Sequence, residues 1–414
     1  MNGIQLKTNI KPVNQGMLSD ISVSIKDCIC IKDVETKSSS QILSGYKPNF
    51  NATIVDKLLL NGATIIGKTI QDEFGFGSFG VNSSYKITNP LDNTRVPGGS
   101  SSGSAVAAKT IKKHLAIAES TGGSIVNPAA FCSVYGLCPT YGLISRYGLL
   151  DYANSLDKIG LMSTDLGTIR KGLKVIAGYD EKDSTSVKLN TYPDYLTKNN
   201  KQKYSFIVIN EFIANLDDKI KEAFENKIKE LSSKGHSISY ISMPFIEKYS
   251  IPSYYIIALS ESSTNLARYS GIRYGVQSNM DMHYNKYFEK IRSQNFSKES
   301  KRRIILGTFT RMAGYRDAYY IKALKVRTLI IQKLKDLLEK YDAIIHPTMP
   351  ILPPKISEVE NLKPIEVYNM DLLTVPANLA GLPHLSVPIK EMIGFMITTN
   401  HFEEKKLLDI GDII

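Results

Sequence analysis

The chain has 414 residues, of which 43% are hydrophobic and 22% charged, and its formal net charge at pH 7 is +11. This composition supplies enough apolar side chains for a sizeable core, so it excludes a wholly disordered protein. The positive charge fits an acidic partner such as nucleic acid. A lysine-rich proteome explains the charge equally well, because the lysines are scattered and form no basic stripe interleaved with aromatic residues.

The cysteines and histidines show no pattern of a metal site or a disulfide framework. Cys28, Cys30, Cys132 and Cys138 form no C-x-x-C pair, and none of the six histidines belongs to an H-x-x-x-H motif. No apolar signal segment follows Met1, and no apolar run reaches the roughly 18 residues of a membrane helix. We therefore expect a reduced, cytoplasmic protein with no metal and no membrane segment.

The first elements predicted in chain order are a strand, a helix and a second strand. After a short polar segment, 1–20, residues 21–25 alternate apolar and polar side chains like a strand that ends at Lys26. Residues 53–61 have helical spacing, and Gly62 follows as a stop.

Residues 62–69 match the G-x-x-x-x-G-K-T expression of a phosphate-binding loop. Such a loop follows a strand and precedes a helix, with free backbone amides around the phosphate. Here a predicted helix precedes the motif, and residues 63–66 are apolar and largely β-branched, which is typical of a strand. We therefore reject a nucleotide site at Lys68.

Two Gly-Gly-Ser turns, 98–100 and 122–124, flank a run with helical character at 104–113. Paired glycines followed by a hydroxyl can hold a serine against backbone that approaches a substrate closely. Apolar and small residues continue on both sides, so we expect the segment to be buried rather than a linker.

The remaining chain alternates strands and helices. Residues 180–203 are polar and indicate a surface excursion within one domain, 1–414. Beyond it, the patterns predict strands at 206–209, 237–242 and 343–347 and helices at 217–235 and 315–341, with Asp217 as an N-cap and His346 in a structural role. This alternation predicts the α/β class around one mixed sheet.

Several motifs resemble the amidase signature family, whose members use a Ser-cisSer-Lys triad. They are PGGSSSGSA from Pro97, TGGSIVNPAAFCSVYGLCPTYGLISRYGL from Thr121 and YANSLDKIG from Tyr152. The resemblance is greatest to the A subunits of glutamine-dependent aspartyl/glutamyl-tRNA amidotransferases. It covers about 21–165, with weaker matches at 254–275, 301–331 and 341–388. It implies the amidase-signature fold, one mixed sheet covered by helices on both faces.

The resemblance also implies the catalytic residues of an amidase. Hydrolysis of a carboxamide needs a nucleophile, a proton acceptor and donors for the oxyanion. Ser124 would be the nucleophile, Ser100 the bridging serine on a cis peptide, and Lys26 the base, which must be neutral and hence buried. The oxyanion hole would be formed by backbone amides of Thr121, Gly122 and Gly123.

Three further residues would recognise glutamine, namely Tyr254, Arg303 and Asp371. Arginine suits a planar carboxylate and aspartate suits an ammonium group; each taken alone has an ordinary surface ion pair as its alternative, which is harder to maintain for the set. The resemblance thus implies a glutaminase subunit without a cofactor of its own. It would assemble with B and C subunits and pass ammonia to a partner subunit. That subunit would use ATP and Mg to convert Asp-tRNA(Asn), Glu-tRNA(Gln) or both, and tRNA would be bound through the complex.

The alternatives are a free-standing amidase for another small amide and a catalytically weak scaffold subunit. Four departures from the family pattern leave room for a weakened enzyme: Ser120 stands for a usual Asp, Val126 for a common Arg, Ser102 for a Gly and Ile70 for a common Asn. The segment 1–20 is also shorter than the helical region that usually precedes the lysine. None of these departures removes a member of the triad.

Overall fold

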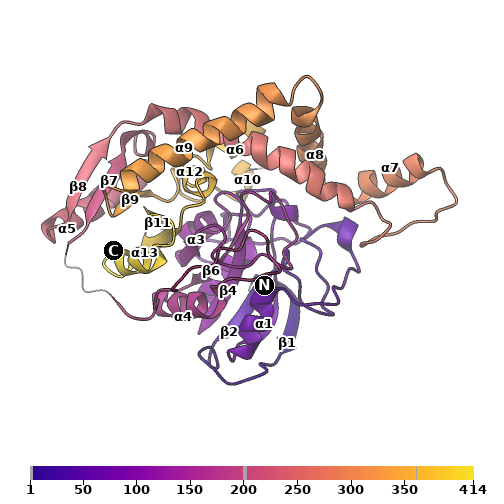
Figure 1. The fold of residues 1–414 in the computed structure, drawn as a ribbon, viewed down its shortest axis with the longest axis horizontal. Helices are drawn as coiled ribbons and strands as arrows, with labels where there is room; N and C mark the ends of the chain where they lie inside the picture. The colour runs from indigo at the N-terminus through magenta and orange to yellow at the C-terminus, as the bar shows by residue number, and fades with distance from the viewer. Residues whose placement is uncertain (1–2, 199–202, 360) are drawn as a thin grey trace.

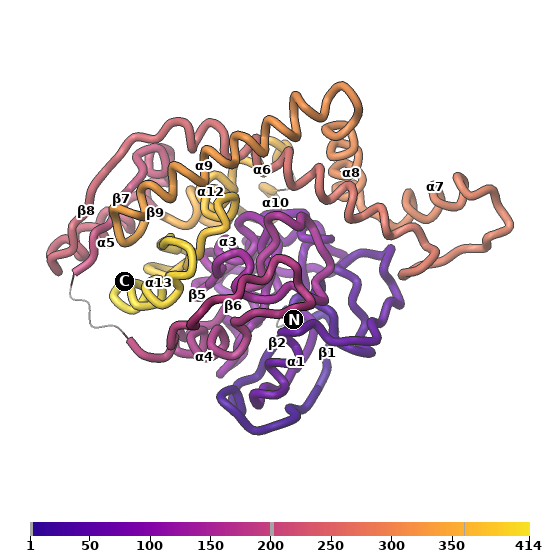
Figure 2. Tube along the Cα trace, viewed as in Figure 1, coloured from indigo at the N-terminus to yellow at the C-terminus, as the bar shows by residue number. Residues whose placement is uncertain are grey.

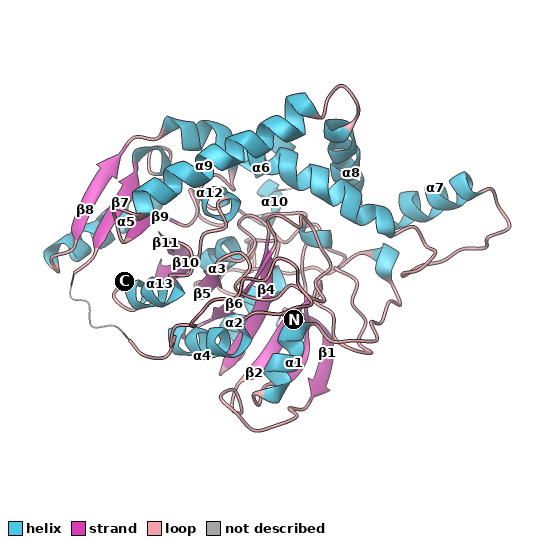
Figure 3. Cartoon of the chain, in the orientation of Figure 1, coloured by secondary structure: helices cyan, strands magenta, loops and turns pink. Residues whose placement is uncertain are grey.

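The computed structural model describes residues 3–198, 203–359 and 361–414. In this part of the chain one mixed sheet of eleven strands runs through the molecule in the order β1-β3-β2-β4-β6-β5-β10-β11-β9-β7-β8 (Figures 1 and 3). The strands are β1 (Ile4–Ile10), β2 (Ser22–Lys26), β3 (Thr64–Thr69), β4 (His114–Ser120), β5 (Tyr135–Cys138), β6 (Lys158–Ser163), β7 (Ser205–Ile209), β8 (Ser237–Ile241), β9 (Ala343–Pro347), β10 (His384–Lys390) and β11 (Ile393–Thr398).

Helices occupy most of the connections between the strands. They are α1 (Thr53–Leu60), α2 (Ser102–Thr110), α3 (Val126–Phe131), α4 (Leu166–Ile176), α5 (Asp218–Ser233), α6 (Pro244–Asn265), α7 (Tyr284–Asn295), α8 (Lys298–Arg311), α9 (Lys322–Leu338), α10 (Ile356–Val359), α11 (Pro364–Asn369), α12 (Val375–Leu379) and α13 (Glu404–Gly411). Together with the mixed sheet they confirm the predicted α/β class.

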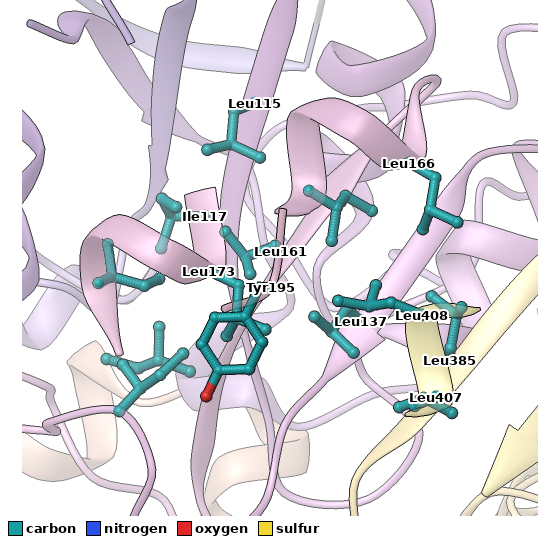
Figure 4. Close-up of a cluster of buried hydrophobic side chains, with 14 of the residues drawn as sticks. Leu115, Ile117, Leu137, Leu161, Leu166, Leu173, Tyr195, Leu385, Leu407 and Leu408 are labelled. Carbon is teal, nitrogen blue, oxygen red and sulfur yellow. The ribbon is translucent and has the colours of Figure 1, made fainter. Parts of the chain in front are cut away.

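Alternation along the strands creates two apolar faces of the sheet, and each is covered by helices. On β4, Leu115 and Ile117 face a core that includes side chains of α1, α4, α5 and α13. Figure 4 shows the part of it where side chains of α4 and α13 gather near β4. Ala116 and Ala118 face the opposite side, where side chains of α2 and α3 pack. The small alanines allow α2 to lie close to the strand. The prediction of helices on both faces is therefore confirmed.

The second half of the sheet repeats this arrangement. On β7, Phe206 and Val208 belong to the core shared with α5, whereas Ile207 and Ile209 pack with side chains of α6 and α9. In Figure 1, α6 and α9 run together along the upper side of the molecule, and α7 projects at the right. No helix in the described ranges is long and apolar enough to cross a membrane.

Strand direction brings the ends of β2 and β4 to one edge of the sheet. β2 is parallel to both neighbours, with Ile25 beside Lys68 of β3 and Ile117 of β4. The carboxyl ends of parallel strands meet at the same edge, which is where α/β proteins build their sites. Lys26 at the end of β2 and the turn after β4 are thereby placed together. The indigo segment with β1, α1 and β2 lies in the lower part of the molecule in Figure 2.

Several predicted elements differ from the structure in their limits or existence. The segment 3–20, expected to be only short and polar, contains β1, an edge strand antiparallel to β3; Met1 and Asn2 lie outside the described residues. The run expected at 104–113 is α2, which ends at Thr110 because Ile111 is extended, with φ −101° and ψ 126°. The helix expected at 315–341 begins with a π-helical turn, Asp317–Ile321, and continues as α9.

The polar segment 180–203 is described as far as residue 198 and again from 203, and these parts contain no helix or strand. Tyr195 within it is buried, and its carbonyl accepts a hydrogen bond from Arg170 at 2.8 Å. The other limits agree with the sequence patterns. Asp217 caps α5 by accepting from the Lys219 amide, and Gly235 follows the helix at φ +86°.

Candidate active site

Lys26 is fully buried at the end of β2 and makes three polar contacts. Its Nζ donates to Ser100 Oγ at 2.9 Å and to the backbone carbonyl of Glu119 at 2.9 Å. It also forms an ion pair with Glu119 Oε2 at 2.8 Å. Val23 and Ile25 of β2 belong to the hydrophobic core, so alternation directs Lys26 to the opposite face, toward Ser100 and the start of α2.

The two Gly-Gly-Ser turns lie side by side. The amide of Ser101 donates to the carbonyl of Ser124 at 3.2 Å, which ties the turns together. The Gly99–Ser100 peptide bond is cis, as the resemblance implies for the bridging serine. Ser100 is fully buried, whereas Ser124 keeps 8% of its surface exposed. The three residues of the predicted triad are thus in one place, with Ser124 nearest to solvent.

The turn before Ser124 requires glycine because other groups approach it closely. A Cβ atom at Gly122 would lie 2.8 Å from the Tyr254 hydroxyl, and one at Gly123 would lie 2.5 Å from Thr374 Oγ1. Asn378 Nδ2 donates to the Thr121 carbonyl and fixes the start of the turn. Within the described residues, the backbone amides of Gly122, Gly123 and Ser124 have no hydrogen-bond acceptor. Amides left free in this way can stabilise an oxyanion.

Arg303 of α8 is buried in an aromatic cage beside this turn. Its Nη1 donates to Tyr152 Oη at 2.6 Å and its Nε to Glu299 Oε1 at 2.7 Å. The guanidinium carbon lies 4.9 Å from the ring centre of Phe76, and the rings of Tyr152, Tyr255 and Tyr368 lie within 6 Å. Such stacking holds the guanidinium in one plane.

Asp371 lies next to the same cage. It accepts hydrogen bonds from Tyr255 Oη at 2.6 Å and from Ser78 Oγ at 3.1 Å. Burial raises the pKa of Asp371, while these two hydrogen bonds and the charge of Arg303 oppose the rise. Tyr254 packs edge-on against Tyr255, with ring centres 4.9 Å apart, and burial raises the pKa of its phenol. Tyr254, Arg303 and Asp371 therefore surround one place and are not surface ion pairs.

A cavity of 390 Å³ opens beside the cage and is lined by Ser78, Arg302, Arg303 and other residues of α8, α11 and the loop 77–82. A larger cavity, of 1030 Å³, lies between the loop 88–95, α5 and the turn before β11, and none of the predicted site residues lines it. Of the predicted site residues, Arg303 lines the smaller cavity, whereas Lys26, Ser100 and Ser124 do not.

Sequence reasoning missed four residues of this region. Glu119 contacts Lys26, Asp157 approaches Thr121 Oγ1 at 2.8 Å, and Tyr152 and Tyr255 hold Arg303 and Asp371. A signal existed for Glu119, because an acidic residue in the otherwise apolar run LAIAES, directly before a Gly-Gly-Ser turn, is unusual for a buried strand.

The departures from the family pattern are accommodated locally. Ser120 Oγ donates to the Gly122 carbonyl at 2.9 Å, so it closes the turn from within. Val126 and Ile70 are buried in the same apolar cluster, and Ser102 is the first residue of α2. All four cysteines are free thiols in buried positions.

Residues 62–69 do not form a phosphate-binding loop. Residues 64–69 are strand β3, and Lys68 is fully buried. Its Nζ donates to the Ile29 carbonyl and to Thr36 Oγ1, and it lies 3.9 Å from Asp27 Oδ1. The rejection of a nucleotide site at Lys68 agrees with this geometry, because no part of that side chain is available to a ligand.

A buried lysine that contacts the first of two coupled serine turns, with free amides before the second, is the arrangement of an amidase. The amidase family pattern matches residues 5–408, and the chain belongs to that family. The A subunit of the glutamyl-tRNA(Gln) amidotransferase of Archaeoglobus fulgidus is 44% identical over 96% of this chain and 86% of its own length. The corresponding A subunit of Thermoanaerobacter pseudethanolicus is 44% identical over 97% of this chain and 83% of its own.

A solved structure extends this relationship. The crystal structure of the A subunit of glutamyl-tRNA(Gln) amidotransferase from Thermotoga maritima superposes with a TM-score of 0.82 at 35% identity, covering 99% of this chain and 85% of that one. Allophanate hydrolase from Kluyveromyces lactis, at 22% identity and a TM-score of 0.79, shares the fold. Within the amidase family the chain groups with the A subunits of glutamyl-tRNA(Gln) amidotransferases.

Proposed function

We propose that this chain is the glutaminase subunit of a tRNA-dependent amidotransferase. Ser124 Oγ attacks the side-chain carboxamide of glutamine and its proton passes through Ser100 to Lys26. The free amides of residues 122–124 hold the oxyanion, and the proton returns to the leaving ammonia. Water then hydrolyses the acyl-enzyme to glutamate. The ammonia passes to a partner that activates misacylated tRNA with ATP and Mg, and the complex acts in the cytoplasm.

The observation that carries this proposal is the 2.9 Å contact between Lys26 Nζ and Ser100 Oγ at the junction of the two turns. A lysine can relay a proton to a bridging serine only at hydrogen-bond distance. The cage around Arg303 supports an amino-acid substrate, since the side chain has five N–H donors and uses two of them among the described residues. The remaining donors are available to an α-carboxylate, and Asp371 to an α-ammonium.

Co-expression with B and C subunits provides the test. We expect the purified complex to release ammonia from glutamine and to amidate Glu-tRNA(Gln) or Asp-tRNA(Asn) when ATP is present. Release of ammonia by the isolated chain from many small amides, with no preference for glutamine, would favour a free-standing amidase. Assembly without any turnover would favour the scaffold.

A further inference from the structure

The contact between Lys26 and Glu119 places a carboxylate beside the proposed base. Glu119 is 4% exposed, and its Oε2 lies 2.8 Å from Lys26 Nζ. A Cβ atom at Gly75 would lie 3.6 Å from Ser100 Oγ and 3.7 Å from Glu119 Oε2, so the hydroxyl and the carboxylate face the same small space. A lysine paired with a carboxylate is held in its charged form, yet only a neutral lysine accepts a proton.

The carboxylate is linked further to a second acid. Thr121 Oγ1 lies 2.9 Å from Glu119 Oε1 and 2.8 Å from Asp157 Oδ1. A hydroxyl carries one proton and donates to one acceptor at a time, so two ionised carboxylates cannot both be satisfied by it. One carboxyl of this cluster must therefore hold a proton in order to donate to Thr121. Burial and then the charge of Glu119 raise the pKa of Asp157.

Asp157 is well placed to be the protonated member. Its Oδ2 accepts from the amides of Tyr152 at 2.8 Å and Ala153 at 3.0 Å, and its Oδ1 shares the Ala153 amide at 3.0 Å and lies 2.8 Å from Thr121 Oγ1, toward which it would carry the proton. Thr121 then donates to Glu119 Oε1. The four groups form a continuous hydrogen-bonded series from Asp157 through Thr121 and Glu119 to Lys26, and Lys26 continues it to Ser100.

We propose that Glu119 is a positioning residue that shares one proton with Lys26 and thereby supplies the neutral amine required by the triad. This proposal rests on the proposed triad. The proton moves from Lys26 Nζ to Glu119 Oε2, which converts the ion pair into a neutral amine and a carboxylic acid without changing the net charge. Lys26 then accepts the proton of Ser100 Oγ as Ser100 takes that of Ser124. When ammonia leaves, the protons return along the same path.

Other titratable groups face this pair from several elements. They are Cys28 after β2, Asp72 after β3, Cys138 on β5 and Asp157 before β6. Burial raises the pKa of Asp72 to about 6 and raises that of both thiols. Near neutral pH, Asp72 adds a negative charge, whereas the thiols are uncharged. Glu119 is the carboxylate in direct contact with Lys26.

The proposal predicts a specific pH dependence. When the pair holds one proton, proton transfer within it produces the active form, so activity is lost only when acid adds a second proton to the carboxylate. Without the carboxylate, only the fraction of enzyme whose Lys26 has lost its proton to solvent can start the reaction, and the acidic loss of activity begins at higher pH. A residue that only supports the fold would change the rate without moving the acid limb, which is the pH range in which activity falls on the acidic side.

The experiment compares Glu119→Gln with wild type and with Glu404→Gln, in the co-expressed complex, by kcat/KM on a small neutral amide from pH 5 to 10. Glu404 is a matched control, because it is also a buried glutamate and lies on α13, where it accepts from the Thr140 amide rather than from Lys26. We expect Glu119→Gln to move the acid limb up by at least one pH unit, which corresponds to about a tenfold loss of kcat/KM at low pH. At high pH the variant should approach the wild-type rate. Glu404→Gln should leave the limb in place.

Three results would overturn the proposal. An equal loss at every pH would make Glu119 a structural residue, and a faster rate at neutral pH would mean that it merely holds Lys26 charged. Glu119→Asp restores a carboxylate at this position. If its activity were still lost at the same pH as in Glu119→Gln, proton sharing would also be excluded. Ser124→Ala is assayed alongside as a test of the triad itself. If that variant is inactive, the proposed function stands, whatever the Glu119 variants show.

Discussion

Replacement of Arg303 by methionine tests whether the aromatic cage recognises the α-carboxylate of glutamine. Methionine fills much of the volume among Phe76, Tyr152 and Tyr255, so it leaves a smaller cavity than alanine. The arginine uses Nη1 and Nε for Tyr152 and Glu299, at 2.6 and 2.7 Å, and its other donors are free for the substrate. The change removes those donors and leaves the triad untouched.

The size of the effect follows from burial. Arg303 is 4% exposed, so a substrate carboxylate bound to it is largely removed from water. Loss of a hydrogen bond to a charged group costs about 1.5–3 kcal/mol, which corresponds to roughly a 10- to 150-fold fall in kcat/KM for glutamine. A small neutral amide lacks the carboxylate and should lose less than about threefold.

The assay is ammonia release from glutamine and from a small neutral amide by wild type, Arg303→Met and Arg302→Met. Arg302 is a matched control, since it is the neighbouring arginine on α8 and contacts the other oxygen of the same Glu299 carboxylate. Equal losses on both substrates would mean that Arg303 supports the fold. If Arg302→Met lost as much activity on glutamine as Arg303→Met, the preference for glutamine would come from local positive charge rather than from hydrogen bonds of the Arg303 guanidinium.

The remaining predictions concern the triad, the rejected nucleotide site and acid stability. Ser124→Ala should abolish glutaminase activity, and Lys26→Ala should nearly do so, while ammonium should still support tRNA amidation by the complex; loss of that reaction too would indicate misfolding. Lys68→Met should lower the free energy of unfolding by about 3 kcal/mol, because it leaves Asp27 without its cation, and calorimetry should show unchanged ATP binding by the complex. Burial lowers the pKa of His114 to about 4, below the unfolded value near 6.5, so its contribution is complete above pH 6.5 and is lost as the pH falls through 4. Thermal melts should therefore show that His114→Gln loses about 3 kcal/mol less unfolding free energy than wild type between pH 6.5 and 4. An unchanged dependence of the unfolding free energy on pH in this range would contradict the prediction.

The sequence predicted those features that local patterns determine. Alternation at 21–25 indicated the strand that carries Lys26, and the glycine pairs marked the turns that hold Ser100 and Ser124. The strand β1 also had a readable pattern, since Ile4, Leu6 and Ile10 share one parity, but its polar surroundings obscured it. Its pairing with β3, 55 or more residues away, could not be read from either segment alone.

The substrate cage could not be assembled from the sequence because its contacts join distant segments. Arg303 meets Tyr152 across 151 positions, and Asp371 meets Tyr255 across 116. Resemblance named Arg303 and Asp371 as candidates, yet their tyrosine partners carry no local signal. The same holds for Asp157, whose approach to Thr121 depends on the antiparallel pairing of β4 with β6.

The energetics of the Lys26–Glu119 pair bear on why it is present. A buried ion pair recovers its desolvation cost only in part, and apolar residues of similar volume are often as stable or more so. Apolar residues at both 26 and 119 would suit the apolar clusters of Leu115 to Ala118, whereas removal of Glu119 alone would leave Lys26 buried without its carboxylate. The pair also adds a second buried acid through Thr121, which increases the cost. Stability therefore gives little reason for the pair as a whole, whereas proton sharing beside Ser100 gives a direct one.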